Sequence, residues 1–274
     1  MATDVTSLEG ETHASVPPLP AAPRTRTLNG PHRRRFVIVY GLLAAVLGAA
    51  VVGLVAYAGK TISPAPAWSA WKPHGGGLGA AKEIADEVGK GYHLPNGNQL
   101  VDVIAKAPSV SPASNLSIPI HYVALHGIKS TADQIVAVSS TDSIMYSLCG
   151  LGASCAIATG KASVQRGTLV RREILELALY TFKYVGGIKN VIAFMPPTPG
   201  SQPKYVVYLQ KSDLSSQLNE PLTRTLATKV PPMSAIPARD TAAINETTGP
   251  RIYSFTLSQT QTGDAVLVLA PVPA

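Results

Sequence analysis

The feature that most constrains this chain is an apolar stretch near its beginning. Residues 36–58 read FVIVYGLLAAVLGAAVVGLVAYA and contain no charged side chain. A helix rises about 1.5 Å per residue, so the stretch is long enough to cross a hydrocarbon core of about 30 Å. A cleaved signal peptide is the alternative, but its apolar region is usually about 7 to 15 residues long, and here all of 1–35 precedes the run. The sequence therefore predicts a transmembrane helix over 36–58, with the lipid bilayer as its partner.

Basic residues flank this stretch unequally. Because positive side chains tend to stay on the cytoplasmic side, we expect the N-terminus inside and residues 61–274 outside the plasma (inner) membrane. The same arginines account for a good share of the formal charge of +7. Aromatic residues do not interleave with them, so nucleic acid is not an expected partner. The basic residues are Arg24, Arg26, Arg33, Arg34 and Arg35 before the stretch, and Lys60 and Lys72 after it.

Shifts in composition divide the rest of the chain. Residues 1–35 lack apolar periodicity and include the proline-rich run SVPPLPAAPRTRT, so a disordered cytoplasmic tail is expected. Residues 59–77 contain prolines, a glycine triplet and two tryptophans, which is typical of a juxtamembrane linker lying along the membrane interface. An extracytoplasmic domain is expected over 78–274.

This domain alternates β-branched runs with turn residues. The clearest helix is predicted over 168–185, with Arg172 and Glu176 on a water-facing side. Residues 230–250 are expected to form a long irregular connection, and 251–271 a β-hairpin. We therefore expect an α+β domain in which an antiparallel or mixed sheet packs against one long helix. The predicted strands cover 98–107, 117–128, 134–140, 143–149, 190–197, 204–210, 251–259 and 264–271, and a shorter helix begins near Leu78.

The chain has two cysteines, Cys149 and Cys155, six positions apart. This spacing is wider than the C-x-x-C redox motif and wider than the usual gap in structural zinc pairs. Gly150 and Gly152 let the backbone turn back, so a small disulfide loop is possible, and such bonds persist outside the cytoplasm. We predict this disulfide, with two buried free thiols as the alternative. Closing the loop should stabilise the fold by about 2.4 kcal/mol in the chain-entropy model.

The segment CAIATGKAS, residues 155–163, resembles a phosphate-binding loop of the form G-x-x-x-x-G-K-[S/T] only in its GK pair. Cys155 stands where the first glycine should be, and Ala162 replaces the hydroxyl residue that would hold magnesium. Residues 160–163 are therefore expected to form a turn that leads into the long helix.

The segment GASCA, residues 152–156, resembles a nucleophile elbow, so Ser154 could in principle join a catalytic triad. That motif needs a helix directly after the serine, whereas the clear helix is predicted to start some twelve residues later. Histidines 121 and 126 are an odd number of residues apart and would point to opposite faces of a strand. No set of three metal ligands converges by spacing, and no metal or other cofactor is expected. The candidate triad partners are His121, His126, Asp133 and Asp142.

Three arginines near the start of the long helix form a candidate anion-binding patch, which could bind anionic envelope polymers or lipid headgroups. An ordinary solvated surface is the alternative. Small residues also recur every four positions in the apolar stretch, where two helices could approach closely and form a homodimer. The candidate patch consists of Arg166, Arg171 and Arg172, and the candidate helix-association stripe of Gly41, Ala45, Ala49 and Gly53.

These features favour a single-pass membrane protein that displays a non-catalytic binding or accessory domain in the cell envelope. Another envelope protein or an anionic polymer is the expected partner. A membrane-anchored envelope hydrolase is the alternative. The richness in Ala, Gly and Pro is typical of a bacterium with a GC-rich genome.

Overall fold

A computed structural model describes residues 33–58, 67–113, 116–127 and 135–272. The chain divides into two units, 1–64 and 65–274. In the first, helix α1 covers Arg33–Ala58 and is long and apolar enough to cross a membrane. The helix expected over 36–58 is thus present, and its insertion into a membrane remains a prediction. The disordered tail was predicted over 1–35, and 1–32 lie outside the described residues. Residues 33–35 form part of the first turn of α1.

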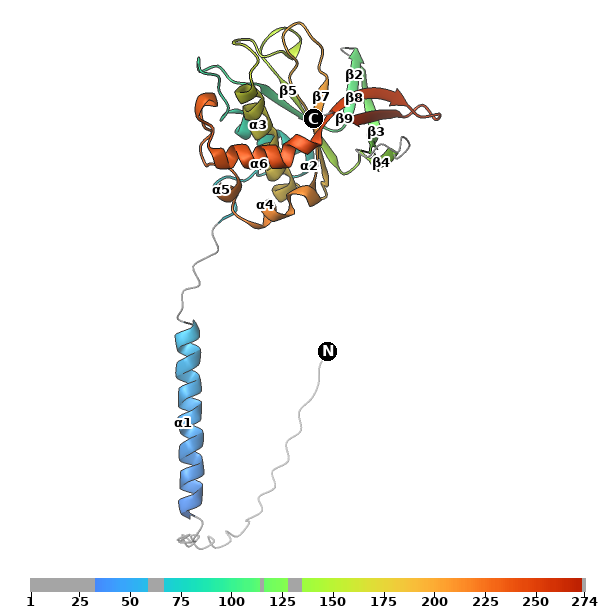
Figure 1. Cartoon of the computed structure of the whole chain (residues 1–274). Coiled ribbons are helices and arrows are strands. Elements are labelled where there is room, and N and C mark those ends of the chain that lie inside the picture. Colours follow the sequence, from blue (N-terminus) through green and yellow to red (C-terminus); the bar gives the residue numbers. More distant parts are fainter. Residues whose placement is uncertain (1–32, 59–66, 114–115, 128–134, 273–274) are drawn as a thin grey trace, which may run out of the picture. The chain divides into compact units, whose positions relative to one another are not determined.

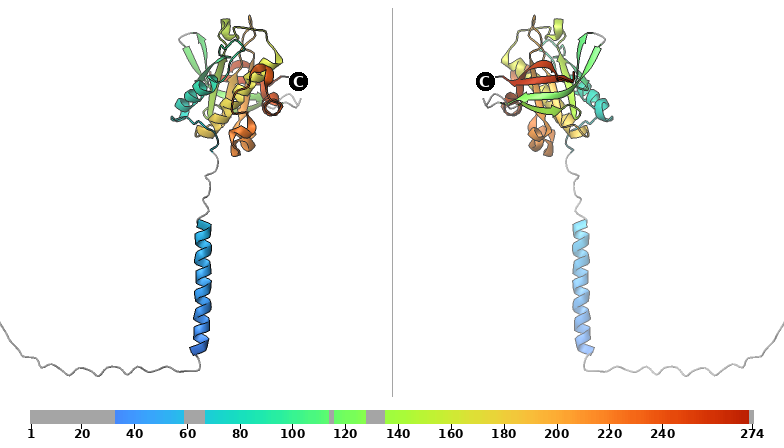
Figure 2. Two further views of the ribbon diagram at one scale, coloured as in Figure 1. Left: turned by 90° about the vertical axis from the view of Figure 1, so that its left-hand side faces the viewer. Right: turned by 90° about the vertical axis from the view of Figure 1, so that its right-hand side faces the viewer.

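The second unit is built on a nine-stranded mixed sheet (Figure 1). The strand order is β1-β5-β6-β7-β8-β9-β3-β2, with β4 also paired to β3. The β3–β9 and β5–β6 pairs are parallel and the others antiparallel, so the expected mixed sheet is confirmed, and it curls into a nearly closed barrel. Figure 2 shows the red C-terminal strands beside the green β3. The strands are β1 Asp102–Lys106, β2 Ser109–Ala113, β3 Leu116–His126, β4 Ile135–Ser139, β5 Ser143–Cys149, β6 Asn190–Phe194, β7 Tyr205–Gln210, β8 Ile252–Gln259 and β9 Ala265–Pro271.

Side chains alternate between two apolar cores on the two faces of this sheet. In β5, Ile144 and Tyr146 belong to the larger core under the helices, whereas Met145 belongs to the smaller core inside the curl. In β6, Val191 and Ile192 divide in the same way. Because both faces are covered, these strands are continuously apolar, which explains why the sequence marks them clearly.

The prediction of one long helix is wrong, because the described residues contain six α-helices. The helix α3 is the long helix expected, and it is joined on this side of the sheet by α2 and α6 (Figure 1). Pro221 separates two short helices, as its missing N–H and rigid ring require. Besides α1 the helices are α2 Gly77–Gly89, α3 Val164–Tyr184, α4 Ser215–Asn219, α5 Leu222–Thr225 and α6 Ala238–Thr248.

The helix α6 corrects a second expectation, since it lies within the segment 230–250 that was predicted to be irregular. Its sequence, ARDTAAINETT, carries few apolar residues, and only Ile244 among them is buried. The helix is therefore held by tertiary contacts with α3, which an apolar pattern does not reveal.

The folded unit also begins before the predicted boundary at residue 78. Trp68 is buried, and its ring packs edge-on against Tyr180 and Tyr184 of α3 at centroid distances of 5.5 and 5.7 Å. Trp71 packs against Tyr180 as well. Both tryptophans, expected in a juxtamembrane linker, thus pack against α3 of the folded unit.

Candidate functional site

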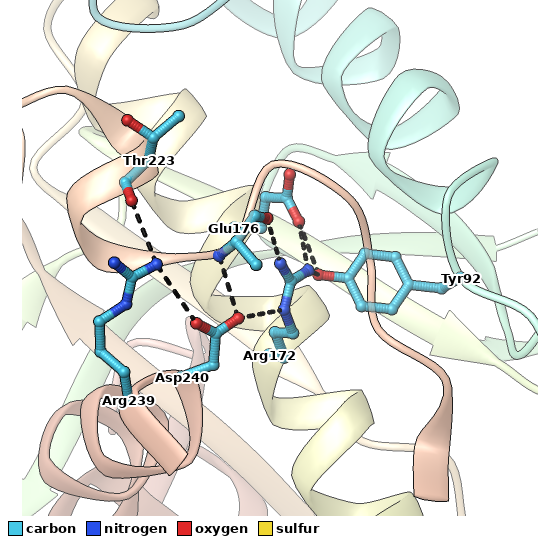
Figure 3. A network of polar contacts seen from close by, with 7 residues as sticks. Tyr92, Arg172, Glu176, Thr223, Arg239 and Asp240 are labelled. Atoms are coloured by element: carbon cyan, nitrogen blue, oxygen red, sulfur yellow. Dashed lines mark hydrogen bonds and ion pairs between the residues drawn. The ribbon is translucent and has the colours of Figure 1, made fainter. Parts of the chain in front are cut away.

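A buried network of polar side chains joins α3 to α6 (Figure 3). Arg172 has 1% of its side chain exposed, and its Nε lies 3.3 Å from Asp240 Oδ2. Its Nη1 donates to the Tyr92 hydroxyl at 2.5 Å and to Glu176 Oε2 at 3.1 Å. Its Nη2 donates to the Ala227 carbonyl at 2.7 Å. Protein acceptors from distant segments thus enclose the guanidinium.

Burial sets the protonation of the groups around it. Burial raises the pKa of Tyr92 well above its ordinary value, and the hydroxyl donates to Glu176 Oε2 at 2.6 Å. Burial also raises the pKa of the Glu176 carboxyl, against the opposing effect of the Arg172 guanidinium. The network is a structural link between α3, α6 and the segment that follows α2.

Glu173 lies next to Arg172 along the helix but on a different face. It is 0% exposed, and neither carboxyl oxygen has a hydrogen-bond partner in the described part of the chain. Burial, with a smaller contribution from the charge of Glu176, raises the pKa of Glu173 well above 4.5. In the folded protein, burial therefore favours the neutral form of this side chain over its charged form.

These positions correct the picture of a water-facing side on α3 and divide the candidate anion patch. Arg172 is buried against carboxylates and cannot meet an anion from solvent. Arg171 donates to Asn245 Oδ1 at 2.7 Å on α6. Arg166 occupies a separate place at the start of α3. The three arginines thus lie in different surroundings, and Arg166 is the one of the three that lines a cavity.

The start of α3 is bordered by two hollows that share Arg166. One, of about 380 Å³, is lined by polar residues that include Thr159 and Lys161 and by apolar residues that include Leu94 and Met233. The other, of about 130 Å³, has an apolar wall formed by Ile157, Val170, Met195 and prolines 196, 197 and 199. Ser163 lines both hollows and is the N-cap of α3, accepting a hydrogen bond from the Arg166 amide at 3.2 Å. The segment 160–163, expected to be a turn, is irregular after a bend over 158–160 and leads directly into α3, with Ser163 as the N-cap.

Arg166 is 7% exposed, and the protein supplies hydrogen-bond acceptors for only part of its guanidinium. Its Nη2 donates to the Thr159 carbonyl at 2.8 Å. Its Nε is buried without a partner, and no carboxylate lies within ion-pair distance of it among the described residues. An arginine has five N–H donors, so most of its hydrogen-bonding capacity remains available.

Gly160 gives the guanidinium its room. It has φ of +75°, which favours glycine, and a Cβ placed there would lie 2.4 Å from Arg166 Nη2. This glycine belongs to the GK pair of the sequence. The structure gives the reason for a glycine at this position, which is the close approach of the Arg166 side chain.

The cysteine loop supports the same region. Cys149 and Cys155 lie at disulfide distance, with sulfurs 2.10 Å and Cα atoms 4.4 Å apart. The Gly150 amide donates to the Cys155 carbonyl at 2.8 Å, and a Cβ at Gly150 would lie 2.3 Å from Ala156. The loop thus fixes the segment that continues to Ile157 and the wall of the smaller hollow.

The structure does not assemble the candidate triad from the residues that it describes. Ser154 lies in a short 3-10 turn at φ of +53°, Cys155 follows at φ of +62°, and the chain is extended from Ala156, so the helix that an elbow requires does not follow the serine. His121 Nδ1 lies 3.3 Å from Asp264 Oδ1, on the hairpin turn. Asp142 pairs with Lys189 at 3.1 Å. His126 ends β3, and Asp133 lies outside the described residues.

Sequence reasoning missed Tyr92, Asp240, Thr159 and Lys161 as members of either cluster. The GK pair, Gly160 and Lys161, shortly before the long helix was the available signal for the cavity. Within the described residues no group of three potential metal ligands was found. Comparisons with protein-family models, with curated proteins and with solved structures found no match to this chain.

Proposed function

We propose that this chain is a single-pass membrane protein that displays a non-catalytic binding domain on the external face of the plasma membrane. The observation that carries the proposal is the Cys149–Cys155 pair at disulfide distance in the domain that follows the apolar helix. A disulfide of this kind is stable in an oxidising compartment and is rare in the cytoplasm.

The charges beside α1 support the same orientation. Five arginines precede the apolar stretch, and few basic residues follow it closely. Such an asymmetry retains the N-terminal side in the cytoplasm and sends the domain outward.

The character of the cavities at the start of α3 favours binding over catalysis. The titratable side chains that line them in the described structure are Lys161 and Arg166, which are donors of hydrogen bonds. Such groups hold an anion without supplying the general base that hydrolysis requires.

The orientation is tested in cells that carry the full chain with one epitope tag at each end. Protease added to intact spheroplasts should remove the C-terminal tag and leave the N-terminal tag, and opened spheroplasts should lose both. Alkylation of the untreated cells followed by mass measurement should label neither cysteine until a reductant is added. A protected C-terminal tag, or two thiols that label without reductant, would contradict the proposal.

A further inference from the structure

We propose that the hollow between Lys161 and Arg166, at the N-terminus of α3, binds a phosphate monoester group. This inference rests on the proposed binding role and names the chemistry of its ligand. It is argued from the donors that converge there and from the absence of any carboxylate that would satisfy them within the described structure.

The first element is the helix itself. The α3 helix has 21 residues, and no acidic side chain lies in its first turn. Its N-cap, Ser163, accepts from the Arg166 amide through its side chain and from the Gly167 amide through its carbonyl. Ser163 and Arg166 are the residues of this helix start that line the larger hollow. The positive end of the helix dipole favours an anion at this place.

The second element is independent of the helix end. Arg166 is more than nine-tenths buried, lines both hollows, and has a buried Nε without a partner. The Arg166 Nη2 already has the Thr159 carbonyl as its acceptor, but a buried charge with no counter-charge and an unpartnered N–H costs free energy, and an anion beside the guanidinium would lower this cost. Its planar fork suits two oxygens of one phosphate.

The third element distinguishes phosphate from a carboxylate. Lys161 is exposed and lines the larger hollow together with Arg166, so two positively charged residues border the same space. Hydroxyls of Thr159 and Ser163 line the same space. Several donors from different directions match the three terminal oxygens of a phosphate monoester better than the two oxygens of a carboxylate.

The shared position of Arg166 also suggests where the rest of the ligand lies. The smaller hollow has a wall of prolines and Met195 and contacts the same guanidinium. An organic phosphate could therefore place its phosphate on Arg166 and a small apolar substituent against this wall. A free phosphate and a lipid phosphate headgroup share the chemistry, and they differ in this second contact.

The test uses the full chain purified in detergent and phosphate-free buffer, so that its result does not depend on membrane orientation. Binding of inorganic phosphate and of dihexanoyl phosphatidic acid is measured separately by calorimetry, with acetate as competitor. Saturable binding of either phosphate supports the proposal, and the stronger of the two identifies the source. An absence of saturable binding by both would overturn it, as would displacement by an equal concentration of acetate.

Variants then locate the site. Arg166→Gln should weaken binding by about tenfold or more, because a charge-assisted, fork-shaped contact is lost. The matched control is Arg171→Gln, which makes the same charge change on the same helix outside the hollow and should alter binding by less than about twofold.

Two further variants keep the proposal testable if Arg166→Gln does not fold. Lys161→Gln changes an exposed side chain and should weaken binding by about threefold to tenfold. Gly160→Ala should weaken it by displacing the guanidinium. Affinities that are unchanged in both variants would overturn the site. Failure here would leave the spheroplast result intact, so the two proposals fail separately.

Discussion

Replacing Glu173 by glutamine should stabilise the domain increasingly as the pH rises. Glu173 is fully buried, and its two carboxyl oxygens lack hydrogen-bond partners in the described structure. Burial raises its pKa well above 4.5 in the folded protein, whereas the unfolded chain exposes an ordinary carboxyl. The folded state therefore keeps a proton that the unfolded state releases.

The sign and size of the effect follow from this difference. A raised pKa of an acid gives full relative stability below the unfolded pKa, and this stability is lost as the pH rises toward the folded pKa. One retained proton costs about 1.4 kcal/mol per pH unit in this window. In this window the variant should therefore gain stability relative to the parent protein, by up to that amount for each pH unit.

The assay is urea unfolding of the full chain in detergent at several pH values, followed by tryptophan fluorescence. Trp68 and Trp71 both pack against α3 tyrosines, so their emission reports the unfolding of this domain. Glutamine has almost the same size and also lacks partners, so the pH dependence of the difference isolates the charge. The contribution of Glu176, whose pKa is also raised, is common to both proteins and cancels.

An exposed glutamate on α6 provides the matched control. Glu246→Gln should give a curve parallel to that of the parent protein. The reasoning is refuted if Glu173→Gln differs from the parent by the same free energy at every pH, because the buried carboxyl would then ionise as easily in the folded as in the unfolded chain.

Three other changes should have effects that are easily measured. Asp240→Ala leaves Arg172 buried without its α6 partner and should lower the free energy of unfolding by about 3 to 5 kcal/mol in chemical unfolding. Arg239→Ala, which changes an exposed side chain, should lower it by less than about 1 kcal/mol. Equal losses would contradict a central role for the buried pair. Cys149→Ser with Cys155→Ser should lower the free energy of unfolding by about 2.4 kcal/mol, and reductant should then have no further effect. Leucines at the four small positions of α1 should abolish crosslinked dimers of the full chain, and persistence of the dimers would show that this stripe is not the contact. The four positions are Gly41, Ala45, Ala49 and Gly53.

The strands under the helices could be read from the sequence because both of their faces are apolar. The segments 143–149, 190–194 and 205–210 pack into one core with one set of residues and into the other core with the alternate set. Their pairing could not be read. The STDS stretch at 140–143 is a plausible hairpin turn between β4 and β5, yet β4 pairs with β3 and β5 pairs with β1 and β6. The turn at 260–264 does join a pair, because β8 and β9 form the hairpin predicted over 251–271. Local turn residues therefore identify a neighbouring partner in one case and do not identify the distant partners of β4 and β5.

The buried charges of α3 escaped prediction for a related reason. Arg172 and Glu176 stand at the i,i+4 spacing that also occurs on exposed helix faces. Their burial depends on Asp240, 68 positions later, and on Tyr92, 80 positions earlier. The helix that carries Asp240 has too few apolar residues to be predicted from the sequence. The pairing of Arg172 with Asp240 therefore could not be predicted from either residue.

The three arginines of the candidate patch differ in whether the protein itself supplies acceptors for the guanidinium. Arg172 meets carboxylates of α3 and α6, and Arg171 meets an amide oxygen of α6. Arg166 lies beside a backbone carbonyl and a hollow. All three add the same charge to the sequence, so composition cannot rank them. The difference lies in the acceptors that tertiary structure places opposite each one: among the described residues, Arg166 meets a backbone carbonyl and borders two hollows, at a helix start whose first turn has no acidic residue.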